Sequence, residues 1–227
     1  MRSRIAAAAV ALGATTALLA GCTGGSPGGE GAADGPSSAN LYLYQAPVQF
    51  NPLAPGQGAE QLTMSLVYNG LFNVGPDFEP VPRLAESWDI PDDQTYIFTL
   101  REGVTFHNGQ PLTAADVKFT FDRIKDEATA SPRVAQFTSV ESIEATDDST
   151  VAFTFKQPYT IGIYDIGGQM IVPQHIFSEV DDLVTFTNEN PVGTGPFKIT
   201  SHAPGVKTVF EPNEDWWGTP EHNLDKV

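Results

Sequence analysis

Two strand–turn–strand patterns with an amphipathic helix between them constrain the fold of this chain more than any other feature. The strand-favouring segments form two pairs, residues 87–90 with 96–100 and residues 142–145 with 151–155. In the helix predicted between these pairs, Val117, Phe121 and Ile124 recur at i, i+4 and i+7 after Thr113, a good N-cap. Because strands and helices do not alternate strictly, the sequence predicts an α/β or α+β fold.

Less distinct patterns flank this centre. Strands are predicted at residues 40–44, 197–201 and 207–211, and a helix at residues 59–68. The apolar side of that helix is expected to carry Leu62, Leu66 and Val67. Between the first strand and the helix lies a loop rich in Pro and Gly.

The first 22 residues predict the compartment. Residues 1–4 are basic, residues 5–20 are apolar and small residues precede Cys22, so residues 1–21 are typical of a secretory signal peptide. The ending before Cys22 resembles the lipobox of bacterial lipoproteins, which implies acylation of Cys22; the alternative is an ordinary signal peptide with an incidental cysteine. Cys22 is the only cysteine, which excludes an intramolecular disulfide. Residues 22–39 are predicted to form a flexible, lipidated tether.

The charge balance excludes several classes of partner. The chain has 12 basic and 28 acidic residues, which gives a formal net charge of −16. Such an acidic surface argues against binding nucleic acid or an anionic membrane through a basic patch. With 41% hydrophobic residues the sequence is that of a globular protein, and no segment after the leader is apolar enough to cross a bilayer.

The sequence contains no pattern typical of a catalytic or metal site. The four histidines are scattered, without the close His or Cys spacing that zinc sites use. Of the acidic pairs Asp92-Asp93, Asp147-Asp148 and Asp181-Asp182, two fall in predicted turns, where aspartate is expected on structural grounds. We therefore expect no enzymatic activity, no metal and no cofactor.

Four blocks of sequence carry a resemblance to a known family. The longest is residues 82–124, PRLAESWDIPDDQTYIFTLREGVTFHNGQPLTAADVKFTFDRI, and the others are residues 67–72, 191–197 and 213–227. In order and spacing they resemble the family 5 extracellular solute-binding proteins, which deliver oligopeptides, dipeptides, nickel chelates and some sugars to ABC importers. Many of these residues also have plain roles in core packing and turns, so the blocks identify a scaffold rather than a reaction.

The resemblance implies an α/β fold of the periplasmic-binding-protein class, type II. Residues 40–227 would form the first lobe, with an inserted α+β subdomain at about residues 75–190, and residues 40–44 would share a sheet with residues 197–211. Family members clamp their ligand between two lobes, whereas this chain is expected to be a truncated member that lacks the second lobe. Such a lobe alone would be marginally stable, prone to self-association and nearly unable to bind peptide.

The function implied by the resemblance is the capture of oligopeptides, or a related small solute, for an ABC importer. The expected partners are that solute, the permease subunits of the importer and the cell membrane, on whose extracytoplasmic side the lipid anchor would hold the chain. The alternative is a surface interaction or signalling lipoprotein, or a non-transporting remnant of the same scaffold.

The ligand-binding candidates come from three segments. Gln45 and Phe50 lie in the loop after the first predicted strand, which the resemblance places near the cleft between the lobes. Gln45 could bond the peptide groups of a ligand, and Phe50 could either wall the pocket or pack within the lobe. Arg133 stands at a predicted helix start, with a plain surface arginine as the alternative, and Gln169 precedes a segment that the family places beside the ligand.

Overall fold

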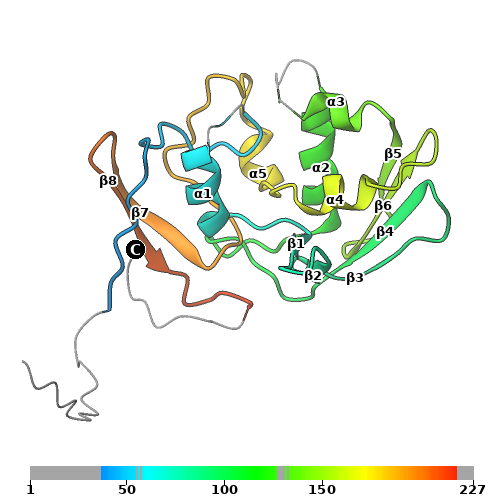
Figure 1. Ribbon diagram of the computed structural model, residues 1–227, viewed down its shortest axis with the longest axis horizontal. Coiled ribbons are helices and arrows are strands. Elements are labelled where there is room, and N and C mark those ends of the chain that lie inside the picture. Colours follow the sequence, from blue (N-terminus) through cyan, green and yellow to red (C-terminus); the bar gives the residue numbers. More distant parts are fainter. Residues whose placement is uncertain (1–36, 55, 57, 127–130, 132, 219–227) are drawn as a thin grey trace, which may run out of the picture. The chain divides into compact units, whose positions relative to one another are not determined.

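The computed structural model describes residues 37–54, 56, 58–126, 131 and 133–218 (Figure 1). These residues belong to one compact unit, Pro36–Val227, in which helices and strands are mixed along the chain. The fold is α/β, as predicted. The predicted signal peptide, Cys22 and most of the predicted tether lie outside the described residues.

A four-stranded antiparallel sheet occupies the middle of the chain. Its order is β3 (Ala85–Asp89), β4 (Thr95–Leu100), β6 (Thr150–Phe155) and β5 (Val140–Ala145). Both predicted hairpins are confirmed, and the pairing of β4 with β6 joins them into one sheet. Because this pairing joins a strand before residue 130 to one after residue 140, the chain does not divide between them into two consecutive domains. Along β4 and β6, buried and partly exposed residues alternate because successive side chains of a strand point to opposite faces.

Helix α2 (Ala114–Lys125) packs against this sheet and has the predicted start. The Asp116 carboxylate accepts hydrogen bonds from the backbone N–H and the hydroxyl of Thr113, at 2.9 and 3.1 Å, which caps the first turn. The predicted apolar face is fully buried, and the ring of Phe121 meets that of Phe153 in β6 with centroids 4.9 Å apart. We call β3, β4, β5, β6 and α2 the central region.

Residues 40–47, α1 (Gly58–Val67), β7 (Phe197–Ala203) and β8 (Lys207–Pro212) form what we call the terminal region. The two predicted late strands and the predicted helix are confirmed; β7 and β8 pair as an antiparallel hairpin, and α1 contacts β7. The predicted buried side of α1 is wrong in part, because Leu62 is 46% exposed while Thr63 is buried. Thr63 tolerates burial since its hydroxyl donates to carbonyls of the preceding helical turn, so a polar residue occupies the inward position.

The predicted strand at residues 40–44 is absent from the described fold. The segment runs beside the β7–β8 hairpin (Figure 1), but the sheet that contains β7 and β8 has two strands among the described residues. The predicted common sheet is therefore wrong for this part of the chain. A strand needs a hydrogen-bonded neighbour, and high β propensity does not supply one. As a consequence, Tyr42 and Tyr44 are 92% and 83% exposed.

The remaining elements are short. They are β1 (Phe72–Val74), β2 (Pro80–Pro82), α3 (Val134–Phe137), α4 (Gly162–Gly167) and α5 (Gln174–Phe177). β1 and β2 form an antiparallel hairpin directly before β3. This hairpin is held against α4 so closely that a Cβ added at Gly167 would lie 1.9 Å from the ring of Phe72. The boundaries of the inserted subdomain, about residues 75–190, remain a prediction.

Candidate functional site

A cavity of about 370 Å³ lies between residues 40–47 and the β7–β8 hairpin. Thr63 and Leu66 of α1 also line it, and His202 and Phe210 contribute from the hairpin. The walls therefore combine apolar and aromatic surface with a few hydroxyl, imidazole and backbone polar groups. This is the composition that ligand pockets commonly have.

The backbone of residues 40–47 is the main source of polar groups at this cavity. Within the described part of the chain, none of its N–H and C=O groups takes part in a hydrogen bond. The pattern changes at Val48, whose N–H donates to the Glu60 carboxylate at 3.2 Å. An unpaired edge of strand-like sequence can pair with another extended chain, which is a common way for proteins to hold peptides.

Gln45 and Phe50, both predicted to contact ligand, have different environments. Gln45 is exposed and lines the cavity. Phe50 is only 1% exposed, and its ring packs edge-to-face against that of His202 with centroids 4.9 Å apart. Its N–H donates to the carbonyl of Thr187, and its carbonyl accepts from the amide of Asn188. Gln45 is thus accessible to a ligand, whereas Phe50 packs inside the fold and its contact with ligand stays a prediction.

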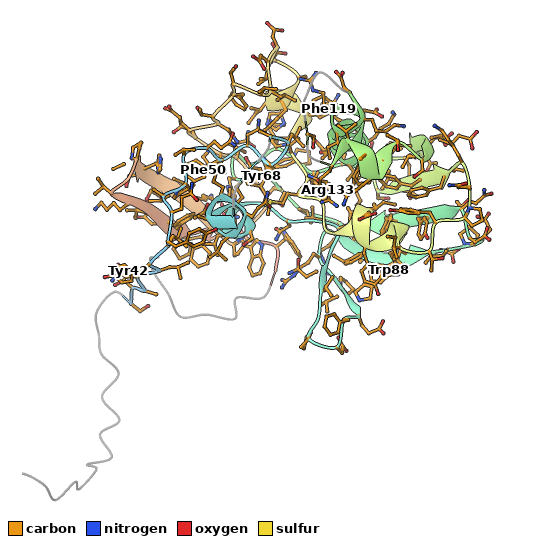
Figure 2. All side chains as sticks on the ribbon, turned by 45° about the horizontal axis from the view of Figure 1, so that its top comes forward. Tyr42, Phe50, Tyr68, Trp88, Phe119 and Arg133 are labelled. Carbon is orange, nitrogen blue, oxygen red and sulfur yellow. The ribbon has the colours of Figure 1, made fainter. Side chains whose placement is uncertain are left out.

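Arg133 and Gln169, which were predicted separately, lie together. Arg133, labelled in Figure 2, precedes α3. It donates from Nη1 to Gln169 Oε1 at 3.1 Å and from Nη2 to the Asp165 carbonyl at 2.7 Å. Its guanidinium carbon is 5.6 Å from the ring centroid of Phe137. Gln169 is 2% exposed and donates from Nε2 to the Met170 carbonyl. These two candidate residues therefore form one polar cluster, apart from the residues that line the cavity.

The hydrogen bonds of the Arg133 guanidinium are made largely within this cluster. Burial lowers the pKa of the Arg133 guanidinium, and the charge of Asp165 opposes this change. The side chain stays positively charged in either case. Since Nε also donates to the Gln136 side chain at 2.8 Å, each nitrogen of the guanidinium already has an acceptor. These three bonds use three of the five N–H groups, so a ligand at this cation would compete with the glutamine side chains for it.

The acidic pairs are turn residues. Asp92 and Asp147 each accept the backbone N–H two positions later, at 2.9 and 2.8 Å, and these bonds lower the pKa of both carboxyls. Over the described residues, no group of three or more His, Cys, Asp or Glu side chains could hold a metal ion. In the same part of the chain, no helix has the length and apolar character needed to cross a membrane.

His107, in the loop that leads into α2, bonds the segment that leads into β7 and so links the central and terminal regions, a role that no sequence signature indicates. Its Nδ1 accepts from the Gly193 N–H at 3.3 Å, and its Nε2 donates to the Gly195 carbonyl at 3.0 Å. Both bonds require a neutral ring with its proton on Nε2. Burial, with a smaller contribution from Lys198, lowers the pKa of His107 to about 4. The segment that His107 bonds is also in close contact with α1, since a Cβ added at Gly193 would lie 2.0 Å from the Val67 carbonyl oxygen.

A buried tyrosine fixes the far end of the loop that carries Gln45. The Tyr68 hydroxyl accepts from Asn188 Nδ2 at 2.8 Å, and the same nitrogen donates to the Phe50 carbonyl at 2.8 Å. Burial raises the pKa of Tyr68, so the hydroxyl stays protonated. Figure 2 shows Tyr68 and Phe50 near each other beside α1. The chain after residue 47 is thus anchored, in contrast to residues 40–47, whose backbone has no partner among the residues that the structure describes.

Sequence comparison assigns this chain to a family. Residues 79–227 match the family described as bacterial extracellular solute-binding proteins, family 5 Middle. Protein XP55 of Streptomyces lividans is 36% identical over 223 residues, which cover 96% of this chain and 39% of that protein. The dipeptide-binding protein DppE of Bacillus subtilis is 27% identical over 241 residues, which cover 96% of this chain and 44% of DppE. The chain spans about two fifths of the length of these relatives.

Solved structures agree with this assignment. The ABC transporter substrate-binding protein CtaP of Listeria monocytogenes is 34% identical, with a TM-score of 0.77 over 85% of this chain and 40% of CtaP. The oligopeptide-binding protein AppA of Bacillus subtilis, solved with a nonapeptide, is 27% identical, with a TM-score of 0.76 over 85% of this chain and 40% of AppA. The predicted resemblance is confirmed: this chain belongs to family 5 of the bacterial extracellular solute-binding proteins, which are binding proteins and not enzymes.

Proposed function

We propose that this chain contributes to the capture of an extended peptide for an ABC importer. The observation that carries the proposal is that the backbone of residues 40–47, along the cavity, has no hydrogen-bond partner among the described residues. Two relatives support this ligand class, since DppE is named as dipeptide-binding and AppA was solved with a nonapeptide.

Binding would start with backbone pairing. A peptide laid along residues 40–47 can exchange N–H···O=C bonds with the segment, each contributing roughly 0.5–1.5 kcal/mol. The side-chain amide of Gln45 can donate as well as accept, so it suits the peptide groups of any sequence. Tyr42 and Tyr44 offer exposed rings against which side chains of the ligand can pack. This arrangement would select for extended backbone more than for particular side chains.

Arg133 and Gln169 are the proposed second contact. If Gln169 turned away from Nη1, the guanidinium could bind a peptide carboxylate in the bidentate geometry that arginine favours. The contact would form only for ligands that place a carboxylate there, because an uncharged group would not compensate for the lost glutamine bond. The ring of Phe50 packs edge-to-face against that of His202. Phe50 would therefore contact the ligand only if the His202 ring moved away.

Amide-resolved NMR titration of the 227-residue chain with peptides of two to nine residues tests the proposal. Because a lobe alone is expected to bind peptide only weakly, the amide signals of residues 41–46 should shift at high peptide concentration. Gln45→Ala should weaken binding about fivefold, the equivalent of one neutral hydrogen bond, because the backbone pairing remains. Gln61→Ala, which removes an exposed glutamine of α1, is the matched control and should leave the titration unchanged. Absent shifts, or shifts confined to other segments, would contradict peptide capture at this edge.

We also propose that an acyl group on Cys22 anchors the chain to the outer side of the cell membrane. The proposal is supported by the basic, apolar and small-residue order of residues 1–21. Cys22→Ser should remove acylation and move the protein from the membrane fraction to the medium, whereas Ser26→Ala in the same tether should not. An unchanged membrane fraction of the Cys22→Ser variant would refute the anchor.

A further inference from the structure

The turn at the tip of the β1–β2 hairpin contains a residue that its backbone disfavours. The Phe78 N–H donates to the Gly75 carbonyl at 3.0 Å and the Gly75 N–H donates to the Glu79 carbonyl at 2.8 Å, which makes residues 76–78 a three-residue loop. This is the pattern of a type I turn followed by one left-handed residue. The left-handed residue is Phe78, with φ of 66°.

Left-handed backbone suits glycine and is costly for a residue with a Cβ atom. The β7–β8 turn follows this rule, since its left-handed residue is Gly205, with φ of 72°. Phe78 breaks the rule without gaining from packing, because its side chain is 79% exposed. A backbone outlier that neither burial nor turn chemistry explains indicates a function for its side chain.

Three further exposed apolar side chains lie on β1 or at α4, the helix that packs against this hairpin. Val74 is in β1, and Tyr164 of α4 donates from its hydroxyl to the Phe78 carbonyl at 3.3 Å. Ile161 precedes Tyr164 by three positions at the start of α4, which places both on one side of the helix. We call Val74, Phe78, Ile161 and Tyr164 the hairpin-tip patch. Figure 2 shows the hairpin projecting beyond the sheet, next to Trp88.

The charges at the tip are negative. Asp77 and Glu79 flank Phe78 and are exposed, and the Asp77 carboxylate accepts from the Glu79 N–H at 3.2 Å, which fixes it in the turn. Residues 72–82 include neither Lys nor Arg. An anionic lipid surface, or a second copy of this acidic chain, would be repelled by these carboxylates. Their complement is a protein surface with an apolar hollow edged by Lys or Arg.

We propose that the hairpin-tip patch docks into such a hollow on the extracytoplasmic face of a permease subunit. This rests on the proposed function, because a chain that captures solute for an importer must present a surface to its membrane subunits. The tip is held in place by the buried ring of Phe72 and by the bond from Tyr164 to Phe78, so docking requires little further ordering. No residue of the patch is among those that line the cavity at residues 40–47, so the two proposed sites share no residue.

Site-specific photo-cross-linking in the native cell tests this surface. p-Benzoylphenylalanine replaces Phe78 in one variant and, as a control, replaces Val206, an 80% exposed residue of the β7–β8 turn. Position 78 should cross-link a polytopic permease subunit well above the yield at position 206. Combining Asp77→Lys with Glu79→Lys should lower that yield about tenfold. Equal yields at the two positions, or cross-links only to lipid, to a second copy or to another class of protein, would overturn the proposal.

Phe78→Gly separates docking from folding. Glycine relieves the left-handed backbone, so the melting temperature should rise by about 2 °C. Cross-linking of the permease subunit from p-benzoylphenylalanine at position 164 should nevertheless fall about tenfold. A lower melting temperature, or an unchanged yield, would overturn the docking role. The peptide titration at residues 41–46 is read independently, so its failure alongside a retained cross-link would refute peptide capture but not docking.

Discussion

The central and terminal regions differ in how completely their strand-forming segments are paired. In the central region, β4 and β6 each have a hydrogen-bonded neighbour on both sides. In the terminal region, β7 and β8 pair only with each other among the described residues, and residues 40–47 have no backbone partner there. Similar strand-favouring sequence thus forms a four-stranded sheet in one region, whereas in the other it leaves residues 40–47 without a backbone partner among the described residues.

The two regions differ in apolar packing in the same way. The ring of Phe153 is fully buried, with the rings of Phe98 and Phe121 at centroid distances of 6.0 and 4.9 Å. Tyr42, a ring of similar size, is almost wholly in solvent. Burying a large apolar side chain contributes about 1.5–3 kcal/mol. The central region therefore supplies stability, whereas residues 40–47 supply a surface that can bind.

The largest predicted effect tests this difference in packing. Phe153→Ala should lower the free energy of unfolding by about 3–5 kcal/mol, because it leaves a void between two other rings. Phe210→Ala is the matched change in the terminal region, and it should cost only about 2 kcal/mol, since fewer packed atoms lose their neighbours. Phe210 is 4% exposed but already borders the 370 Å³ cavity. Urea denaturation measures both losses, and equal values would show that the regions are packed alike.

The central region could be predicted from the sequence because its determinants are local. Asp92 and Asp147 mark turns between alternating segments, and both carboxylates accept backbone bonds in those turns. Thr113 and Asp116 mark the start of α2 through a bond three residues apart. Each of these sequence signals lies within a few residues of the bond that it predicts. Contacts with distant parts of the chain therefore did not alter the predicted turns and helix start.

The terminal region and the candidate site could be predicted only in part. Residues 40–44 have strand propensity, but propensity does not say whether a partner strand is present. Gln45 was proposed because the resemblance places its loop near the cleft, and its contact with ligand stays a prediction. The bond between Arg133 and Gln169 joins residues 36 positions apart and has no local signature. Phe78 did have one, since it follows Pro-Asp in a position where a turn of this type favours glycine.

A change in stability of intermediate size is expected from protonation of His107, which links the two regions. The pKa of an unperturbed histidine is about 6.5, and burial lowers that of His107 to about 4 in the folded chain. The neutral ring is therefore favoured by folding, and its contribution to stability is complete above about pH 6.5 and is lost as the pH falls toward 4. For this partly exposed ring the loss should be about 2 kcal/mol, measured by urea denaturation across that range.

Two variants assign this pH dependence. His107→Gln keeps an amide donor and an acceptor but cannot be protonated, so it should flatten the stability profile between pH 6.5 and 4. His202→Gln, a histidine substitution in β7 away from this junction, is the matched control. A slope that persists in His107→Gln would show that another group causes it and that the junction does not depend on a neutral His107.

The smallest effect on stability is expected from a substitution in residues 40–47, and this segment gives the most direct test of the difference between the two regions. Since Tyr42 is 92% exposed and its backbone is unpaired among the described residues, Tyr42→Ser should change the free energy of unfolding by less than about 0.5 kcal/mol. Hydrogen exchange should show the same contrast, with amides 41–46 exchanging near the intrinsic rate and those of β6 only on global unfolding. Saturating peptide should slow exchange at residues 41–46 and leave β6 unchanged. Protected amides in the absence of peptide would mean that this edge already has a partner, and the proposed mode of peptide capture would then lose its basis.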